Sequence, residues 1–124
     1  QLVKNGIVRF HGFQSDPRAF YAMSHCVVLP SYHEGMSNVL LEAASVGRAL
    51  ICSDIPGCRE AVEEGKNGYL CKRMDENSLY SCMKLFIELD ENQRRAMGYY
   101  GRKKMEKEFD KEEVVKHTVD KILQ

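Results

Sequence analysis

The stretch from Cys26 to Ala44 constrains the fold of this chain more than any other part of the sequence. It begins with four consecutive apolar residues, continues through a short loop that contains Gly35, and enters an apolar helix predicted from about Ser37 to Val46. A strand that is apolar throughout is typical of a parallel sheet covered on both faces. The loop and the start of the helix then lie at the carboxyl edge of that sheet, where open α/β folds bind phosphate-bearing ligands.

Two carboxylates lie in this stretch, Glu34 in the loop and Glu42 inside the helix. The apolar residues of the helix form no narrow stripe, so we expect the helix to be buried on most sides. A buried carboxylate needs a partner. A pair of ligand hydroxyls would serve Glu42, and so would a structural salt bridge or the N–H groups of a neighbouring loop. Glu34 is either a ligand contact or a solvated loop acid.

The rest of the sequence repeats the alternation of strands and helices. Further short strands are predicted at 8–10, 49–52 and 69–71, and helices from residue 15 or 16 and at about 59–63. From residue 77 the pattern is helical, with predicted helices at 77–90, 91–109 and 111–123. We therefore predict one α/β domain. A Rossmann-like parallel sheet flanked by helices occupies about residues 1–75, and a helical C-terminal tail occupies about residues 76–124.

The composition excludes several classes of protein. Lysine plus arginine and aspartate plus glutamate each number 18, so the net charge is zero and no nucleic-acid partner is expected. The five cysteines include no Cys-x-x-Cys pair and the four histidines are unclustered, so no metal site is predicted. The sequence shows neither a membrane-spanning apolar run nor a signal peptide. Cysteines in apolar runs favour a reduced, cytoplasmic location.

The order of the motifs also resembles a known family. The segment Pro-Ser-Tyr-His-Glu-Gly, followed by a helix whose Glu42 lies eight positions after Glu34, is similar to the Glu-x7-Glu motif of family-four retaining glycosyltransferases, which have the two-domain GT-B fold. Downstream, GRALICSDIPGCREAVEEGKNGYLC has the family's apolar strand, Gly-x-x-Glu turn and Asn-Gly turn in the same order. The resemblance extends from about Val8 to Phe109 and points to enzymes that build bacterial surface polysaccharides.

The resemblance implies that this part of the chain binds a nucleotide-diphosphate sugar, and it assigns roles to the two carboxylates. Glu34 is the implied catalytic residue, which lies beside the transferred sugar and stabilises the positive charge that develops there. Glu42 accepts hydrogen bonds from the two ribose hydroxyls. The acceptor is a saccharide, which is lipid-linked in the enzymes that the sequence resembles.

The resemblance also implies the remaining donor-binding residues. Backbone N–H groups of Gly35, Met36 and Ser37 are expected to bind the diphosphate at the start of the helix. His11 and Gly12 end a predicted strand at the same edge and are further donor-binding candidates. Neither a metal nor another cofactor is expected, because amides and basic residues stabilise the leaving diphosphate.

The resemblance covers only part of a GT-B enzyme. The implied partner is the N-terminal, acceptor-binding domain of the same parent chain, and the first two strands of the donor domain, with their basic residues, precede the region matched here. In the intact family those strands lie between the Val8 strand and the Cys26 strand. We therefore expect a truncated GT-B C-terminal domain that is inactive alone, is prone to self-association through an open sheet edge, and meets the membrane only peripherally, at its inner face, in the full-length protein.

Two other functions remain open at this point. The first is a non-catalytic nucleotide- or phosphate-binding module, and the second is a sugar-nucleotide epimerase of the same fold. The pair Glu34 and Glu42 discriminates a transferase from a binding module, because a module that only binds has no need of the Glu34 carboxylate beside the sugar. Arg59 and Glu60 recur in the polysaccharide-building branch of the resembled family, and we interpret them as a salt bridge at the start of a helix.

Overall fold

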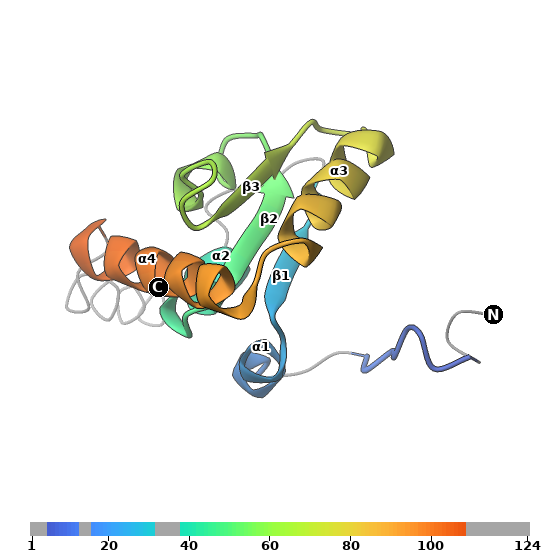
Figure 1. The fold of residues 1–124 in the computed structure, drawn as a ribbon, viewed down its shortest axis with the longest axis horizontal. Coiled ribbons are helices and arrows are strands. Elements are labelled where there is room, and N and C mark those ends of the chain that lie inside the picture. Colours follow the sequence, from blue (N-terminus) through green and yellow to red (C-terminus); the bar gives the residue numbers. More distant parts are fainter. Residues whose placement is uncertain (1–4, 13–15, 32–37, 109–124) are drawn as a thin grey trace, which may run out of the picture.

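The computed structural model describes residues 5–12, 16–31 and 38–108. It contains one parallel sheet of three strands in the order β1-β2-β3. These strands are β1 (Cys26–Leu29), β2 (Ala49–Ser53) and β3 (Gly68–Cys71). Val27 pairs with Leu50, and Ile51 pairs with Tyr69. Helices lie on both faces of the sheet (Figure 1), so the predicted Rossmann-like α/β fold is confirmed.

The helices agree with the predicted order. They are α1 (Arg18–Met23), α2 (Asn38–Ser45), the short 3₁₀ helix η1 (Arg59–Ala61), α3 (Glu76–Ile87) and α4 (Glu91–Glu108). The start of α4 has a reciprocal cap, in which the Asp90 carboxylate accepts from the Gln93 N–H at 2.8 Å and the Gln93 side chain accepts from the Asp90 N–H at 2.9 Å. The helix predicted at 111–123 lies outside the described residues.

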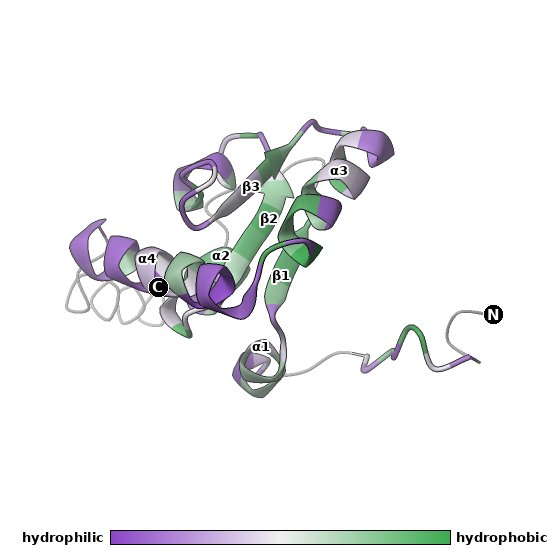
Figure 2. Cartoon of the chain, in the orientation of Figure 1, coloured by the Kyte–Doolittle hydropathy of each residue, from purple (hydrophilic) through white to green (hydrophobic). Residues whose placement is uncertain are grey.

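The central strand β2 divides the core into two layers, because successive side chains of a strand point to opposite faces. All five residues of β2 are buried. Leu50 and Cys52 pack with α2, η1 and Met105 of α4, whereas Ala49 and Ile51 pack with α3 and Met97 of α4. Figure 2 shows β2 as a hydrophobic strand and α4 as a mostly hydrophilic helix.

Helix α2 ends in a glycine turn that positions the start of β2. Gly47 has a φ of +85°, a conformation that glycine adopts without steric cost. Its N–H donates to Ala44 O at 2.9 Å, and the Arg48 N–H donates to Ala43 O at 3.0 Å. These two bonds form a Schellman motif, so the prediction that Gly47 stops the helix is confirmed.

The strand predicted at 8–10 is wrong. These residues form no strand, and the segment runs away from the sheet (Figure 1). The Val8 side chain is 44% exposed and Phe10 is 85% exposed. A strand needs a neighbour to pair with, and among the described residues β1 pairs only with β2. The β propensity of residues 8–10 alone is therefore not sufficient to form a strand.

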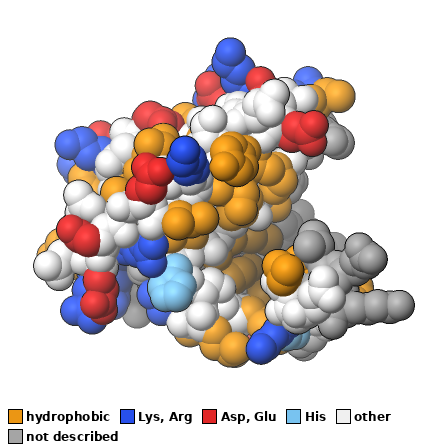
Figure 3. Space-filling model, turned by 45° about the vertical axis from the view of Figure 1, so that its right-hand side comes forward, with side chains coloured by type: hydrophobic (Ala, Val, Ile, Leu, Met, Phe, Trp, Pro, Cys, Tyr) orange, Lys and Arg blue, Asp and Glu red, His pale blue; other side chains and the backbone are white. Residues whose placement is uncertain are grey.

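The strand Cys26–Leu29 is covered on both faces, as expected, but less completely than β2. Val27 and Leu29 pack against one core cluster and Cys26 and Val28 against the other, and all four residues are half-buried. Near β1, the outer surface of α3 carries exposed apolar side chains, namely Tyr80, Met83, Leu85 and Ile87. The space-filling view in Figure 3 shows hydrophobic side chains gathered on one face of the molecule. Among the described residues β1 pairs only with β2, so the sheet has an unpaired edge at β1 in this part of the chain.

Candidate functional site

The carboxyl ends of the three strands meet at one edge of the sheet, as parallel pairing requires. A cavity of about 320 Å³ lies at this edge, and its lining residues are Pro30, Ser53, Cys71, Lys72, Met74, Asp75, Glu76 and Leu79. The cavity thus includes a residue at or just after the end of every strand. This is the edge at which the sequence predicts a phosphate-bearing ligand.

Four of the predicted site residues, Glu34, Gly35, Met36 and Ser37, lie outside the described residues. The structure describes the residues on either side, which are Ser31 after β1 and Asn38 at the start of α2. The catalytic and diphosphate-binding assignments therefore stay predictions.

The structure places Glu42 on α2 but corrects its predicted burial. Glu42 is exposed, while Leu40, Ala43 and Ala44 on the other side of the helix are buried. The helix therefore has one buried face instead of being buried on most sides. The carboxylate needs no internal partner in this position and is available to a ligand.

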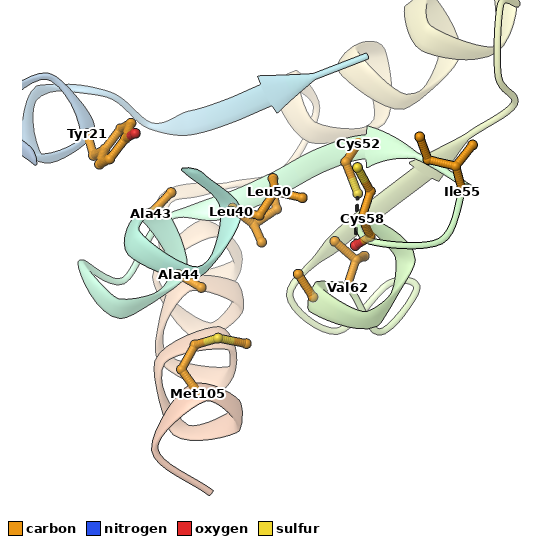
Figure 4. Packing of buried hydrophobic residues seen from close by; sticks show 11 residues of the cluster. Tyr21, Leu40, Ala43, Ala44, Leu50, Cys52, Ile55, Cys58, Val62 and Met105 are labelled. Carbon is orange, nitrogen blue, oxygen red and sulfur yellow. Dashed lines mark hydrogen bonds between the residues drawn. The ribbon is translucent and has the colours of Figure 1, made fainter. Parts of the chain in front are cut away.

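Helix α1 packs against α2, the helix that carries Glu42. Tyr21 of α1 is buried in the same core cluster as Ala43 (Figure 4). The pKa of Tyr21 is raised, first by burial and then by the negative charge of Glu42. The pKa of the Arg18 guanidinium is also raised, chiefly by its hydrogen bond to Asp16 and in smaller part by Glu42. The negative charge of Glu42 thus acts on two side chains of α1.

Asp16 and Arg18 form a local ion pair at the start of α1. The Arg18 Nε donates to Asp16 Oδ1 at 2.9 Å and its Nη2 donates to Oδ2 at 2.8 Å. The Arg18 N–H also donates to Oδ1 at 3.2 Å. These bonds lower the pKa of Asp16 to about 2. Both side chains are well exposed, so the pair contributes little to stability.

A second arginine holds the other end of α1. The guanidinium of Arg48, which precedes β2, donates from Nε to Tyr21 O at 3.0 Å and from Nη2 to Ala22 O at 2.8 Å. A cation is favourable at the C-terminal carbonyls of a helix. Arg48 thus joins α1 to the sheet and fixes the helix that packs against α2. Sequence reasoning missed this contact, because its partners lie 26 and 27 positions away.

The two remaining candidates, His11 and Gly12, are exposed. The imidazole of His11 packs on the Phe20 ring of α1, with the ring centroids 4.6 Å apart. Both residues were predicted to end a strand at the carboxyl edge of the sheet. Residues 8–10 form no strand, so this prediction is wrong for His11 and Gly12. His11 contacts α1, and Glu42 lies on α2, the helix that packs against α1.

The interpretation of Arg59 and Glu60 as a salt bridge at the start of a helix holds for Arg59, whose partner is Asp54, whereas Glu60 accepts a backbone hydrogen bond. The Arg59 Nε lies 3.2 Å from Asp54 Oδ1, and its Nη2 donates to Asp54 O at 3.1 Å. The Glu60 carboxylate accepts from the Gly57 N–H at 2.8 Å. Both charged groups are engaged in holding the turn that begins η1.

The cysteines are all free thiols, and four of the five are buried. The Cys52 thiol donates to Cys58 O at 3.6 Å inside the core (Figure 4). Across the described ranges, no three histidine, cysteine or acidic side chains are grouped so that they could hold a metal ion. In the same ranges, no helix is both long and apolar enough to cross a membrane.

Comparisons with known proteins agree with these features. Residues 2–104 match the model of the family described as "Glycosyl transferases group 1". The capsular polysaccharide biosynthesis glycosyltransferase CapM of Staphylococcus aureus is 30% identical over 95 residues, which are 77% of this chain and 25% of CapM. N-acetylgalactosamine-N,N'-diacetylbacillosaminyl-diphospho-undecaprenol 4-alpha-N-acetylgalactosaminyltransferase of Campylobacter jejuni is 31% identical over 114 residues, 90% of this chain and 30% of that protein.

A solved structure shares the fold. Anabaena Alr3699/HepE, crystallised in complex with UDP, superposes with a TM-score of 0.80 at 22% identity, over 98% of this chain and 34% of that one. The chain thus spans between a quarter and about a third of the length of these proteins. The family match covers most of the chain, including all three strands and α2. On this basis the chain belongs to the group 1 glycosyl transferase family.

Proposed function

We propose that this chain is the donor-binding part of a retaining glycosyltransferase that moves a sugar from a nucleotide-diphosphate sugar to a saccharide acceptor. The observation that carries the proposal is the family match over residues 2–104, which includes the exposed carboxylate of Glu42 on α2. The names of similar proteins support it, since HepE was crystallised with UDP and the Campylobacter enzyme is named for a diphospho-undecaprenol saccharide. A lipid-linked acceptor would place the full-length enzyme at the inner face of the membrane.

The proposed donor site uses one end of α2 and one of its side chains. A nucleotide diphosphate carries two phosphates and a ribose diol, and each needs a different partner. We assign the diphosphate to the N–H groups of Gly35, Met36 and Ser37, which precede α2. We assign the ribose to Glu42, because an ionised carboxylate has two oxygens and accepts a hydrogen bond from each hydroxyl of a diol. Glu42 is free to do so because it is exposed.

The proposed reaction needs one further group beside the sugar. The bond between the anomeric carbon and the diphosphate oxygen breaks, and the nucleoside diphosphate leaves with the electron pair. The acceptor hydroxyl oxygen forms the new bond to the same carbon, and its proton passes to the leaving diphosphate. We assign Glu34 to the positive charge that develops on the sugar, by analogy with the carboxylates of glycoside hydrolysis. The proposal uses no metal.

Nucleotide binding by this chain tests the first part of the proposal. Saturation-transfer NMR with UDP, GDP and ADP is expected to show binding of at least one nucleotide. The Glu42→Gln variant should bind it about tenfold more weakly, as expected when a hydrogen bond to a charged group is lost. Glu88→Gln, which neutralises another exposed carboxylate, is the matched control and should bind as the wild type does. Absence of nucleotide binding by the wild type, or equal binding by Glu42→Gln, would contradict the proposal.

Transferase activity tests the second part. The 124-residue chain alone is expected to give no product, because catalysis needs groups held on both sides of a cleft. In a polypeptide that also carries the acceptor-binding domain, Glu34→Ala should lower kcat, whereas Glu42→Ala should mainly raise the KM for the donor. If Glu34→Ala left kcat unchanged, the assignment of Glu34 to the reacting sugar would be wrong. Nucleotide binding without transfer by that longer polypeptide would favour a binding module.

A further inference from the structure

We propose that the cavity at the carboxyl edge of the sheet binds one uncharged sugar ring, through the Glu76 carboxylate, the Lys72 ammonium group and the side chain of Met74. The proposal rests on the proposed function for the class of ligand, and it adds a subsite that the donor contacts on α2 do not include. Three features carry it: the mixed lining of the cavity, the hydrogen bonds that fix residues 72–79, and the backbone conformation of Met74.

The first feature is the lining of the cavity, which combines charged and apolar groups. Its volume of about 320 Å³ is at the lower end of the range for small-molecule pockets, so it suits a single ring. Lys72, Asp75 and Glu76 supply one cation and two carboxylates, and Pro30 and Leu79 supply apolar surface. A sugar ring needs both kinds of contact, because its hydroxyls form hydrogen bonds and the C–H groups of its face are apolar.

The charges of the lining argue against a phosphate in this cavity. Two carboxylates and one ammonium group give a net negative charge, which repels an anion. The positive end of α3 is already occupied, since Asp75 caps it by accepting from the Ser78 N–H at 3.0 Å. In contrast, the Glu76 carboxylate and the Lys72 ammonium group have no hydrogen-bond or ion-pair partner among the residues that the structure describes. Both groups are therefore available to the hydroxyls of a ligand.

The second feature is the segment between β3 and α3, which forms one wall of the cavity and runs along the carboxyl edge in Figure 1. Local hydrogen bonds fix this wall. The Lys72 N–H donates to Ser78 Oγ at 2.9 Å, and the Asp75 N–H donates to Lys72 O at 3.3 Å. The Leu79 N–H donates to Asp75 O at 3.1 Å. The segment that carries Lys72 and Glu76 is thus ordered before a ligand binds, which lowers the entropic cost of binding.

The third feature is the conformation of Met74, which lines the cavity and is 71% exposed. In the described part of the chain it is the only non-glycine residue with a positive φ, at 58°. A side chain carries a steric cost in this region, and a turn closed like the one between Lys72 and Asp75 favours glycine at this position. The cost brings no buried contact in return, and strained positions cluster at functional sites. We therefore assign the Met74 side chain to the apolar face of the ring.

Saturation-transfer NMR with methyl glycosides tests this proposal. The probes are methyl α-glucoside and methyl N-acetyl-α-galactosaminide, which carry neither a charge nor a nucleotide. They are measured with the 124-residue wild type and with Glu76→Gln, Met74→Asn and Glu88→Gln. Glu88 is the matched control, because it is exposed at the other end of α3, outside the cavity. Asparagine adopts a positive φ more readily than methionine, so Met74→Asn removes the apolar side chain without adding strain.

We expect the wild type to bind at least one glycoside with a millimolar Kd, as is typical of so small a ligand. Glu76→Gln should weaken binding by about two- to tenfold, because an amide oxygen forms weaker hydrogen bonds with hydroxyls than a carboxylate does. Met74→Asn should weaken binding severalfold and leave the urea midpoint equal or higher, whereas a purely structural role would change stability alone. Glu88→Gln should behave as the wild type.

Addition of UDP and of UDP-glucose identifies the source of the ring. If the ring is that of the donor, UDP-glucose displaces the glycoside and UDP does not. If the ring is that of the acceptor, the glycoside and UDP-glucose bind together. Either outcome supports a sugar subsite in the cavity.

Three results would overturn the proposal. Absence of glycoside binding by a wild type that binds UDP, GDP or ADP would remove the sugar subsite and leave the proposed function intact. Binding that Glu76→Gln and Met74→Asn both leave unchanged would place the sugar elsewhere, and displacement by inorganic phosphate would show an anion site. Glycoside binding without nucleotide binding would contradict the donor site at Glu42 and would support this subsite alone.

Discussion

Replacing Gly98 with alanine is expected to destabilise the fold, because Gly98 is the point at which α4 meets the turn between α2 and β2. A Cβ atom on Gly98 would lie 2.0 Å from Gly47 O and 2.9 Å from Gly47 C. The obstructing atoms belong to the backbone of a turn fixed by two hydrogen bonds, so no side chain is able to rotate away. Helix α4 has to move instead.

The size of the effect follows from two opposing contributions. Relief of the overlap requires a displacement of about 1–1.5 Å, since non-bonded atoms need more than 3 Å. Such a displacement disturbs the packing of Met97 and Met105, and overpacking of this kind costs about 3 kcal/mol at the upper end of its range. Alanine gains about 1 kcal/mol over glycine in helix propensity. The expected net loss in the free energy of unfolding is about 2 kcal/mol.

Urea denaturation followed by circular dichroism measures this loss. With m values of about 1–3 kcal/mol/M, the midpoint for Gly98→Ala should fall by about 0.7–2 M. Gly101→Ala, one turn further along α4, is the matched control. Its Cβ would meet the Asn67 side chain at 3.1 Å, which requires a shift of only a few tenths of an ångström, so the propensity gain should cancel the strain. Equal midpoints for the two variants, or a Gly98→Ala variant as stable as the wild type, would refute the reasoning.

Three further outcomes are expected. Arg48→Ala should lower the free energy of unfolding by about 1–3 kcal/mol, because two charged hydrogen bonds to α1 are lost; an unchanged urea midpoint would show that α1 packs without them. Phe10→Ser should change stability by less than about 0.5 kcal/mol, since the ring is 85% exposed, and a larger loss would reveal packing of this segment. Burial raises the pKa of Cys26 to about 12 and also raises that of Cys71 and Cys82, so the reactive thiolates are scarce at pH 8. A thiol-specific disulfide reagent should therefore react slowly with the native protein and quickly in denaturant, and rapid reaction of the native protein would contradict this burial.

The sequence predicts most of the fold because several elements carry local signals. β2 is an apolar run that ends before a turn, and α2 stops at Gly47, whose positive φ ends the helix. The segment 8–10 has the same local signal as a strand and yet forms none. Its failure depends on whether a pairing partner lies next to it, and neither the composition nor the periodicity of the segment contains that information.

The candidate site is predictable to a smaller extent. The spacing of the motif places Glu42 on α2, but the covered side of that helix depends on where α1 and α4 pack, and these contacts are remote in sequence. The Asp16–Arg18 pair has a local signal, an acid two positions before an arginine at a helix start, which sequence reasoning did not use. The contact of Arg48 with α1 has no local signal, because a guanidinium at the start of a strand is compatible with many partners.

The buried face of α2 contributes to the stability of the fold, and its exposed face carries the proposed ligand contact. Its buried face, formed by Leu40, Ala43 and Ala44, holds the helix in the core, and the glycine turn that ends it is fixed by close contact with α4. Glu42 faces outward and contributes nothing to this packing. A carboxylate on a packed helix is placed more accurately than one on a loop. Substitutions at Glu42 should therefore change ligand binding at constant stability, whereas substitutions at Gly98 should change stability first and affect ligand binding only through the position of α2.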